Sequence, residues 1–182
     1  MAQFVSFESN VEVLGGVVLS IIDGMSEYKE IGIKILEDNG IKNIQSDGWY
    51  SLQSLLDAFK EISNKLGEPT LYLIGYRIPE NAVFPPDIDT FEKGLALIDM
   101  AYHMNHRNGD IGYYKYIAVD ENNAKVECKN PYPCEFDKGI IASMSKKYPP
   151  VNIGEDGVII ILDEDSENRK NGGDVSTYDV MW

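Results

Sequence analysis

Two pairs of β-rich runs in the second half of the chain constrain the fold more than any other feature. Residues 112–119 and 124–130 flank the polar stretch DENN, and residues 158–163 and 176–182 flank a longer polar stretch that contains ENRKNGGD. Such runs, separated by polar turn segments, predict antiparallel hairpins. Helical patterns precede and separate them. We therefore expect an α+β fold, with helices packed on an antiparallel sheet built from two hairpins.

Helices are predicted for four segments, at residues 28–39, 49–66, 87–104 and 134–147. In the second and third segments the apolar residues recur every three or four positions, which places them on one face of a helix. Asn39-Gly40 and Gly67 are stop signals, and Asp87 is a candidate N-cap. Residues 11–24 fit an interrupted strand or a poor helix, and both interpretations stay open.

The segment that follows the second predicted helix combines strand composition with several prolines. Residues 70–76, TLYLIGY, predict a strand. Pro79, Pro85 and Pro86 come next, and proline both lacks a backbone N–H and restricts the residue before it. We therefore expect an extended surface loop there. The length of 182 residues fits a single domain over residues 1–182, with a mainly helical first part over residues 1–69.

The charge balance excludes several classes of partner. Acidic residues outnumber basic residues by 30 to 16, which gives a formal net charge of −14. Such a surface repels nucleic acid and anionic lipid. The chain starts without a basic segment, and no apolar run reaches the roughly 18 residues that a membrane span needs. Two cysteines are too few for a disulfide framework. We expect a cytoplasmic protein that binds neither nucleic acid nor membranes.

The motif NPYPC places Cys134 at the start of a predicted helix. A helix N-terminus lowers the pKa of a thiol, which makes a ligand-lining or redox-active cysteine conceivable. Glu135 and Asp137 add negative charge beside the sulfur, and this opposes a thiolate. A cysteine at such a position can also pack as a small apolar residue. These interpretations, and metal ligation, stay open.

The motif AYHMNHR carries both histidines, His103 and His106, at the end of a predicted helix. Asn105, His106 and Arg107 could cap this helix and bond to the Gly109-Asp110 loop. Alternatively, Arg107 could anchor a carboxylate or phenolate inside a pocket. A zinc site formed by the two histidines with Cys128 and Cys134 has a spacing that matches no common structural site.

Two blocks of sequence, PYPCEFDKGIIASMSKKY and ENRKNGGDVSTYDVMW, carry a family resemblance. Over residues 70–182 the chain resembles the 4-vinyl-reductase-like domain, which includes sensor domains of phenol- and xylene-responsive bacterial activators. The resemblance implies the fold group of haem-based nitric oxide sensors and TRAPP subunits, in which an apolar ligand is sheltered between helices and a sheet. Some relatives carry zinc in the last hairpin, but the corresponding positions here are Asp165, Asn168 and Ser176, which are poor zinc ligands. The haem sensors carry a Tyr-x-Ser-x-Arg string, which does not occur in this sequence.

These observations favour a non-catalytic domain that binds or senses a small apolar or aromatic molecule, without metal or cofactor. We expect the site between the 87–104 helix and the sheet, and its residues are predicted to be Trp49, Tyr102, His106, Arg107, Tyr132 and Cys134. One alternative is a structural dimerisation module without ligand, and another is a haem- or metal-binding sensor. No complete catalytic motif occurs, and Cys134 and His106 are the only plausible catalysts. The two apolar stripes predict a homodimer that forms through amphipathic helices.

Overall fold

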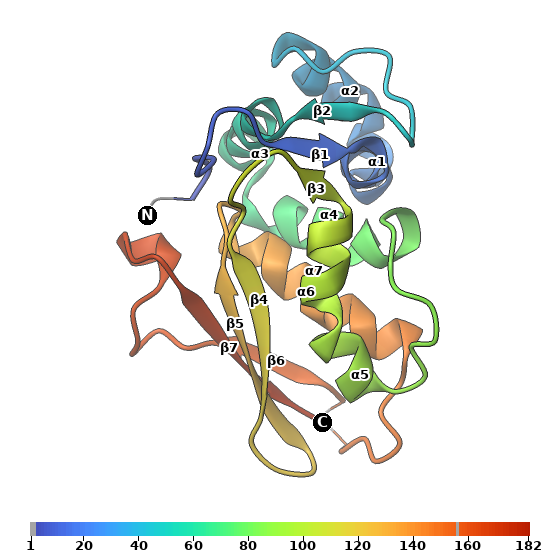
Figure 1. The fold of residues 1–182 in the computed structure, drawn as a ribbon, viewed down its shortest axis with the longest axis vertical. Coiled ribbons are helices and arrows are strands. Elements are labelled where there is room, and N and C mark those ends of the chain that lie inside the picture. Colours follow the sequence, from blue (N-terminus) through green and yellow to red (C-terminus); the bar gives the residue numbers. More distant parts are fainter. Residues whose placement is uncertain (1–2, 156) are drawn as a thin grey trace.

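A computed structural model describes residues 3–155 and 157–182, and its larger sheet has four antiparallel strands (Figure 1). The strand order is β4-β5-β7-β6, with strands β4 (Tyr113–Ala118), β5 (Asn123–Lys129), β6 (Ile159–Leu162) and β7 (Ser176–Met181). Both predicted hairpins are present, and β5 pairs with β7 to join them into one sheet. The predicted α+β class and the antiparallel sheet are confirmed.

A second, three-stranded sheet was not predicted. It consists of β1 (Glu12–Leu14), β2 (Trp49–Ser51) and β3 (His106–Arg107), in the order β2-β1-β3. The segment 11–24, for which both a strand and a helix were considered, forms strand β1 followed directly by helix α1 (Gly15–Gly24). Val13 pairs with His106, so this small sheet fixes the backbone just after the AYHMNHR helix.

The helices agree in part with the predicted segments. Beside α1 they are α2 (Lys29–Asp38), α3 (Leu52–Leu66), α4 (Glu68–Asn81), α5 (Phe91–Ala96), α6 (Ile98–Met104) and α7 (Cys134–Lys147), with short 3-10 turns η1 (Ser26–Tyr28) and η2 (Arg169–Asn171). The predicted helix 134–147 is confirmed at both ends. The helix predicted from Trp49 starts at Leu52, because Ser51 caps it by accepting a hydrogen bond from the Ser54 N–H.

The prediction of a strand at 70–76 is wrong, because these residues lie in α4, and the predicted proline-rich loop is present only over residues 82–90, around Pro85 and Pro86. Leu71, Ile74 and Ile78 are buried, at the i, i+3 and i+7 spacing of a helix rather than the alternation of a strand. Pro79 lies in the last turn of α4. Because proline has no backbone N–H, the helix loses only the one hydrogen bond that this group would donate. Lys147 donates to the Pro79 carbonyl oxygen at 2.6 Å.

The prediction of one helix over 87–104 is also wrong. Thr90, not Asp87, is the N-cap, and its hydroxyl accepts from the Lys93 N–H. Asp87 has a φ of +67°, which does not suit a cap. The helix is interrupted at Leu97, and α6 then docks on β4 through Asp99, whose carboxylate accepts from the Tyr114 N–H at 2.8 Å.

Helices α1, α4 and α7 pack with their backbones in close contact. A Cβ atom at Gly24 would overlap the backbone of Ile74, and one at Gly75 would overlap the carbonyl oxygen of Phe136. Glycine is therefore required for this approach. Helix α4 is therefore closely packed against both α1 and α7.

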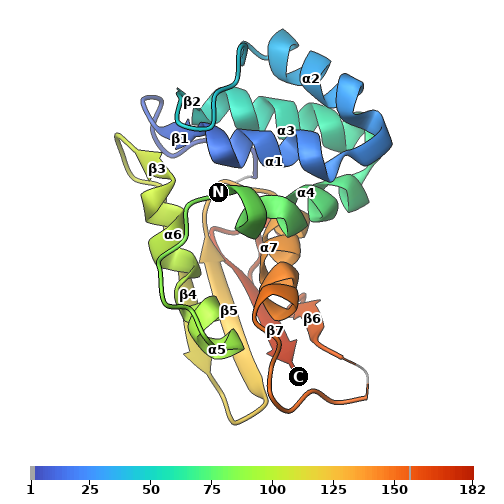
Figure 2. The same cartoon turned by 90° about the vertical axis from the view of Figure 1, so that its right-hand side faces the viewer.

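Helices α5, α6 and α7 cover one face of the four-stranded sheet, whereas α1, α2, α3 and the three-stranded sheet lie at one end of it (Figures 1 and 2). The apolar stripes of the two predicted amphipathic helices are buried inside the chain, including Leu55, Phe59, Phe91 and Leu95. They are therefore not available for contact between copies, and the homodimer stays a prediction. No helix in the described part of the chain is both long and apolar enough to cross a membrane.

Candidate functional site

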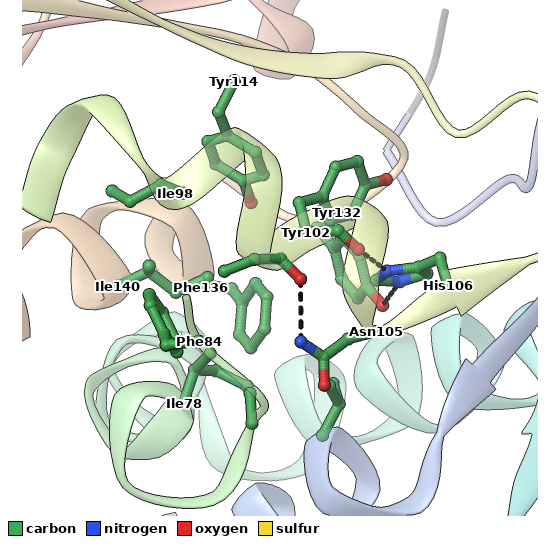
Figure 3. A pocket seen from close by; sticks show the side chains of 13 residues that line it. Ile78, Phe84, Ile98, Tyr102, Asn105, His106, Tyr114, Tyr132, Phe136 and Ile140 are labelled. Carbon is green, nitrogen blue, oxygen red and sulfur yellow. Dashed lines mark hydrogen bonds between the residues drawn. The ribbon is translucent and has the colours of Figure 1, made fainter. Parts of the chain in front are cut away.

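An apolar cavity lies between α1, α4, α6, α7 and strand β4 (Figure 3). Its volume is about 30 Å³, which is enough for a few water-sized molecules. Most of its wall is aliphatic or aromatic. The lining residues are Val17, Ile78, Ala82, Phe84, Ile98, Ala101, Tyr102, Asn105, His106, Tyr114, Tyr132, Phe136 and Ile140. The cavity therefore joins residues from five regions of the sequence.

The polar end of the cavity is formed by His106 and two tyrosines. The Nδ1 atom of His106 lies 2.7 Å from the carbonyl oxygen of Tyr102, and its Nε2 atom lies 2.8 Å from the hydroxyl of Tyr132. A carbonyl oxygen only accepts, so Nδ1 carries the proton and donates. Burial lowers the pKa of His106 to about 4, which keeps the ring neutral near pH 7. Nε2 is then an acceptor, and the Tyr132 hydroxyl donates to it.

Asn105 closes the side of the cavity next to the end of α4. Its amide nitrogen donates to the carbonyl oxygens of Val83 and Ala101, each at 2.7 Å, and its side-chain oxygen accepts from the Val83 N–H at 3.0 Å. Asn105 and His106 therefore both bond carbonyl oxygens in the last turn of α6, which confirms the predicted capping for these two residues. Arg107 makes no such bond, because it pairs with Glu12 at 2.7 Å.

A buried ion pair lies behind the wall formed by the tyrosines. Tyr114 donates its hydroxyl to the Asp137 carboxylate, and the Arg169 guanidinium bonds to the same carboxylate. Arg169 also donates to the carbonyl oxygen of Tyr132 and to the hydroxyl of Ser176. This network holds two cavity residues, Tyr114 and Tyr132, from the side that faces away from the cavity.

Burial also changes the acidity of the tyrosines in the wall. It raises the pKa of Tyr102, Tyr114 and Tyr132 well above the ordinary value, and the negative charge of Asp137 raises the pKa of all three further. Their hydroxyl groups therefore stay protonated. Among the described residues that line the cavity none is charged, so its wall is neutral.

The structure places the predicted site residues in two groups. Tyr102, His106 and Tyr132 lie in the cavity wall, and their part in ligand binding stays a prediction. Trp49 and Arg107 do not lie in this wall, because the Arg107 guanidinium stacks 4.2 Å above the Trp49 ring at the three-stranded sheet. Strand β3 pairs into the three-stranded sheet and leaves the cavity directly after His106. His106 therefore lines the cavity, whereas the next residue, Arg107, lies against Trp49.

Cys134 also lies outside the cavity wall. It is buried, and its Sγ atom lies 3.3 Å from the Ser176 hydroxyl. This position favours the interpretation of Cys134 as a packed residue in the hydrogen-bonded region around Arg169. Within the described residues there is no cluster of three or more His, Cys, Asp or Glu side chains that could hold a metal ion.

Several lining residues were missed in the sequence. Ile78, Ala82 and Phe84 belong to or follow the segment predicted as a strand and loop, and the helical spacing of Leu71, Ile74 and Ile78 was the signal that could have revealed them. Phe136 lies in a predicted helix and Tyr114 in a predicted strand, but no feature of the sequence indicated that their side chains would line this cavity.

No family model and no curated protein matches the sequence. Solved structures do match the fold. An H-NOX protein from S. oneidensis superposes with a TM-score of 0.67 at 12% identity, over 92% of this chain and 95% of that chain. One from K. algicida gives a TM-score of 0.63 at 13% identity, over 92% and 95% of the two chains.

The fold is that of H-NOX proteins. A further match, a structure described as probing heme distortion in the H-NOX family, gives a TM-score of 0.63 at 13% identity over 92% of this chain and 94% of that chain. At these identities the similarity establishes the H-NOX fold and does not transfer a function. It confirms the predicted fold group, whereas the narrower 4-vinyl-reductase resemblance stays a prediction.

Proposed function

We propose that this chain is a ligand-sensing domain that binds a small apolar molecule in the cavity between α4, α6, α7 and β4. The observation that carries the proposal is the composition of the cavity wall, which is almost entirely apolar and has one neutral polar end at His106. Binding sites for small molecules are mostly apolar, with a few placed polar groups. The described space of about 30 Å³ suits a ligand of a few heavy atoms, and a ring compound requires side chains in the wall to move.

A thermal-shift titration with short alkanes and five- and six-membered ring compounds tests the proposal. A ligand that binds only the folded protein raises the melting temperature in proportion to the logarithm of its concentration. Ala101→Leu fills the cavity and is expected to abolish the shift. Ala96→Leu is the matched control, because Ala96 is exposed at the end of α5. Loss of the shift in both variants, or in neither, contradicts the proposed site.

Haem binding is the second candidate, and two observations favour it. Matched H-NOX structures carry haem in their descriptions, and His106 is a buried neutral imidazole, the form of histidine that binds iron. The described residues do not fit a haem, however. The cavity is far smaller than the roughly 300 to 1,000 Å³ of sites for drug-sized ligands, and both ring nitrogens of His106 are hydrogen-bonded.

A titration with haem separates the two candidates. If the apolar-ligand proposal holds, added haem gives only the broad spectrum of free or weakly associated haem, and His106→Ala does not change it. A sharp Soret band at one haem per chain that disappears in His106→Ala would establish the second candidate instead. His103→Ala serves as the control, because His103 is half exposed and lies outside the cavity wall.

A further inference from the structure

Strand β6 forms one edge of the larger sheet, and no further strand in the described part of the chain pairs with its outer side (Figure 2). Asp163, directly after β6, donates its N–H to a carbonyl oxygen of β7 at 2.8 Å. In an antiparallel pair, residues alternate between bonding to the neighbouring strand and pointing away from it. Ile159 and Ile161 therefore bond to β7, whereas the N–H and C=O groups of Ile160 and Leu162 are directed at the outer edge. These groups form a row of donors and acceptors to which an extended chain can bond.

The opposite edge of the sheet, at β4, is covered. There the Asp99 carboxylate of α6 accepts a hydrogen bond from the Tyr114 N–H at 2.8 Å. Edge strands are commonly protected from pairing by a covering element, by charged side chains or by proline. Strand β6 has the sequence IIIL and contains neither a charged residue nor a proline. Ile159 and Ile161 are 37% and 51% exposed on the face of the sheet that the helices leave open. Strand β6 is therefore the edge to which a further strand can add.

Space for such a strand is present beside β6. A groove of about 610 Å³ lies between β6 and the first two turns of α7. Its walls include Ile160, Ile161 and Leu162 on one side, and Glu135 and Lys138 on the other. Neighbouring strands of a sheet lie about 4.8 Å apart. A peptide that bonds to Ile160 and Leu162 would therefore occupy this groove.

The groove is predominantly acidic. Its charged residues are five carboxylates and two lysines, namely Glu135, Asp163, Glu164, Asp165 and Asp179 with Lys138 and Lys170. Glu135 is bonded to Lys170 at 3.1 Å, and Asp179 pairs with Lys125 at 2.8 Å. Both of these carboxylates therefore have a cation beside them already.

Glu164 and Asp165, just beyond the end of β6, are the carboxylates that can pair with a partner. Both are exposed, and among the described residues neither forms an ion pair. A second copy of this chain, with its own net charge of −14, would be repelled from this edge. A basic segment would be attracted to it, because complementary charges favour association.

We propose that the β6 edge is a docking site for an extended segment of a partner protein in which basic and apolar side chains alternate. The segment adds to the sheet as a further strand and bonds to the backbone of Ile160 and Leu162. Its apolar side chains cover the exposed Ile159 and Ile161 on one face, and its basic side chains lie in the acidic groove on the other. In this mode of recognition the backbone bonds supply affinity and the alternating side chains supply specificity. The site is separate from the cavity and does not depend on its ligand.

A fluorescently labelled, end-capped octapeptide of alternating lysine and valine is the probe for this site. Titration with the full-length protein should give a saturable rise in fluorescence anisotropy. The matched peptide, with glutamate in place of lysine, should not bind. Leu162→Pro removes an N–H that faces the groove and places the proline ring there, but leaves the bonds to β7 intact, because the N–H of Leu162 does not point at β7. This variant should lose binding. Leu162→Ala is the control, since it shortens the same side chain but keeps the N–H, and it should still bind the peptide.

Charge reversal tests the acidic groove separately. The double variant Glu164→Lys/Asp165→Lys should bind the lysine peptide about ten-fold more weakly, as expected when two exposed charge contacts become repulsive. Glu27→Lys/Glu30→Lys changes the net charge by the same amount at exposed positions of η1 and α2. This control should change the affinity by less than about two-fold, because salt screens distant charges. Circular dichroism of each variant verifies that it is folded.

Several outcomes would overturn the docking site. These are no saturable binding of the lysine peptide, equal binding by wild type and Leu162→Pro, equal binding of the glutamate peptide, and equal losses in the two charge-reversal variants. Sedimentation of the protein alone tests the other occupant. A dimer of the wild type that becomes monomeric in Leu162→Pro but not in Leu162→Ala would assign the edge to a second copy and overturn the proposed basic partner.

Discussion

The Arg169 guanidinium lies against the Asp137 carboxylate in the interior of the protein, and both side chains are at most 1% exposed. Arg169 comes from the η2 turn between β6 and β7, whereas Asp137 lies in the first turn of α7. The pair therefore ties the last hairpin to the helix that lines the cavity. An ion pair at this depth is retained only with many hydrogen bonds, and Asn130, Tyr132 and Ser176 supply them.

Removing one partner of this pair is expected to be strongly destabilising. Arg169→Met leaves the Asp137 carboxylate buried and unpaired, which should lower the free energy of unfolding by about 3–5 kcal/mol in urea denaturation. Lys170→Met is the control. Lys170 bonds to Glu68 and Glu135 near the surface, so its loss should cost less than about 1 kcal/mol. Equal losses in the two variants would show that the buried pair has no special role.

The stability of the protein should depend on pH through His106. Burial lowers its pKa from 6.5 to about 4, so the unfolded chain binds a proton at a pH where the folded protein does not. This contribution to stability is fully present above pH 6.5 and is lost as the pH falls towards 4. Between pH 7 and pH 5 it should amount to about 2 kcal/mol. Urea denaturation of wild type and His106→Gln at both pH values measures it, since the variant should lose about that much less on acidification. A parallel loss in both proteins would refute the assignment to His106.

A side chain at Gly75 should disrupt the packing of α4 on α7. Its Cβ atom would overlap the Phe136 carbonyl oxygen, and because this neighbour is backbone, the helices themselves must separate. Gly75→Ala should therefore lower the free energy of unfolding by about 1–3 kcal/mol, despite the higher helix propensity of alanine. Gly154→Ala, at a position with no atom within 4 Å, should be nearly neutral in the same denaturation experiment. A stabilised Gly75→Ala protein would show that the close approach of the helices is not required.

Arg107 should not contribute to ligand binding. Its guanidinium stacks on Trp49 and pairs with Glu12 at a half-exposed position outside the cavity. We expect Arg107→Ala to leave ligand-induced thermal shifts unchanged and to cost less than about 1 kcal/mol of stability. Titration of the variant with the best ligand of the thermal-shift panel measures both. Loss of binding in a folded Arg107→Ala protein would restore the sequence-based prediction of an anchoring arginine.

The hairpins and α7 could be predicted because their signals are local. Turn residues and strand composition lie within a few positions of each other in residues 112–130, and the proline-rich entry to α7 marks its first residue. The helix α4 could not be identified in the same way, since TLYLIGY has strand composition and Pro79 lies inside the element. Its helical state is fixed by packing on α1 and α7, which overrides local propensity.

The sequence by itself determined that the chain is an acidic α+β protein with an antiparallel sheet, and that Tyr102, His106 and Tyr132 are candidates for one site. Only the tertiary structure decided that these three share a cavity while Trp49, Arg107 and Cys134 do not. It also decided that Asp137, whose negative charge was expected beside the Cys134 sulfur, is buried with Arg169, 32 residues further along the chain. The physical reason is that spacing along the chain fixes which face of an element a side chain occupies, whereas the neighbours of that face depend on how distant elements pack.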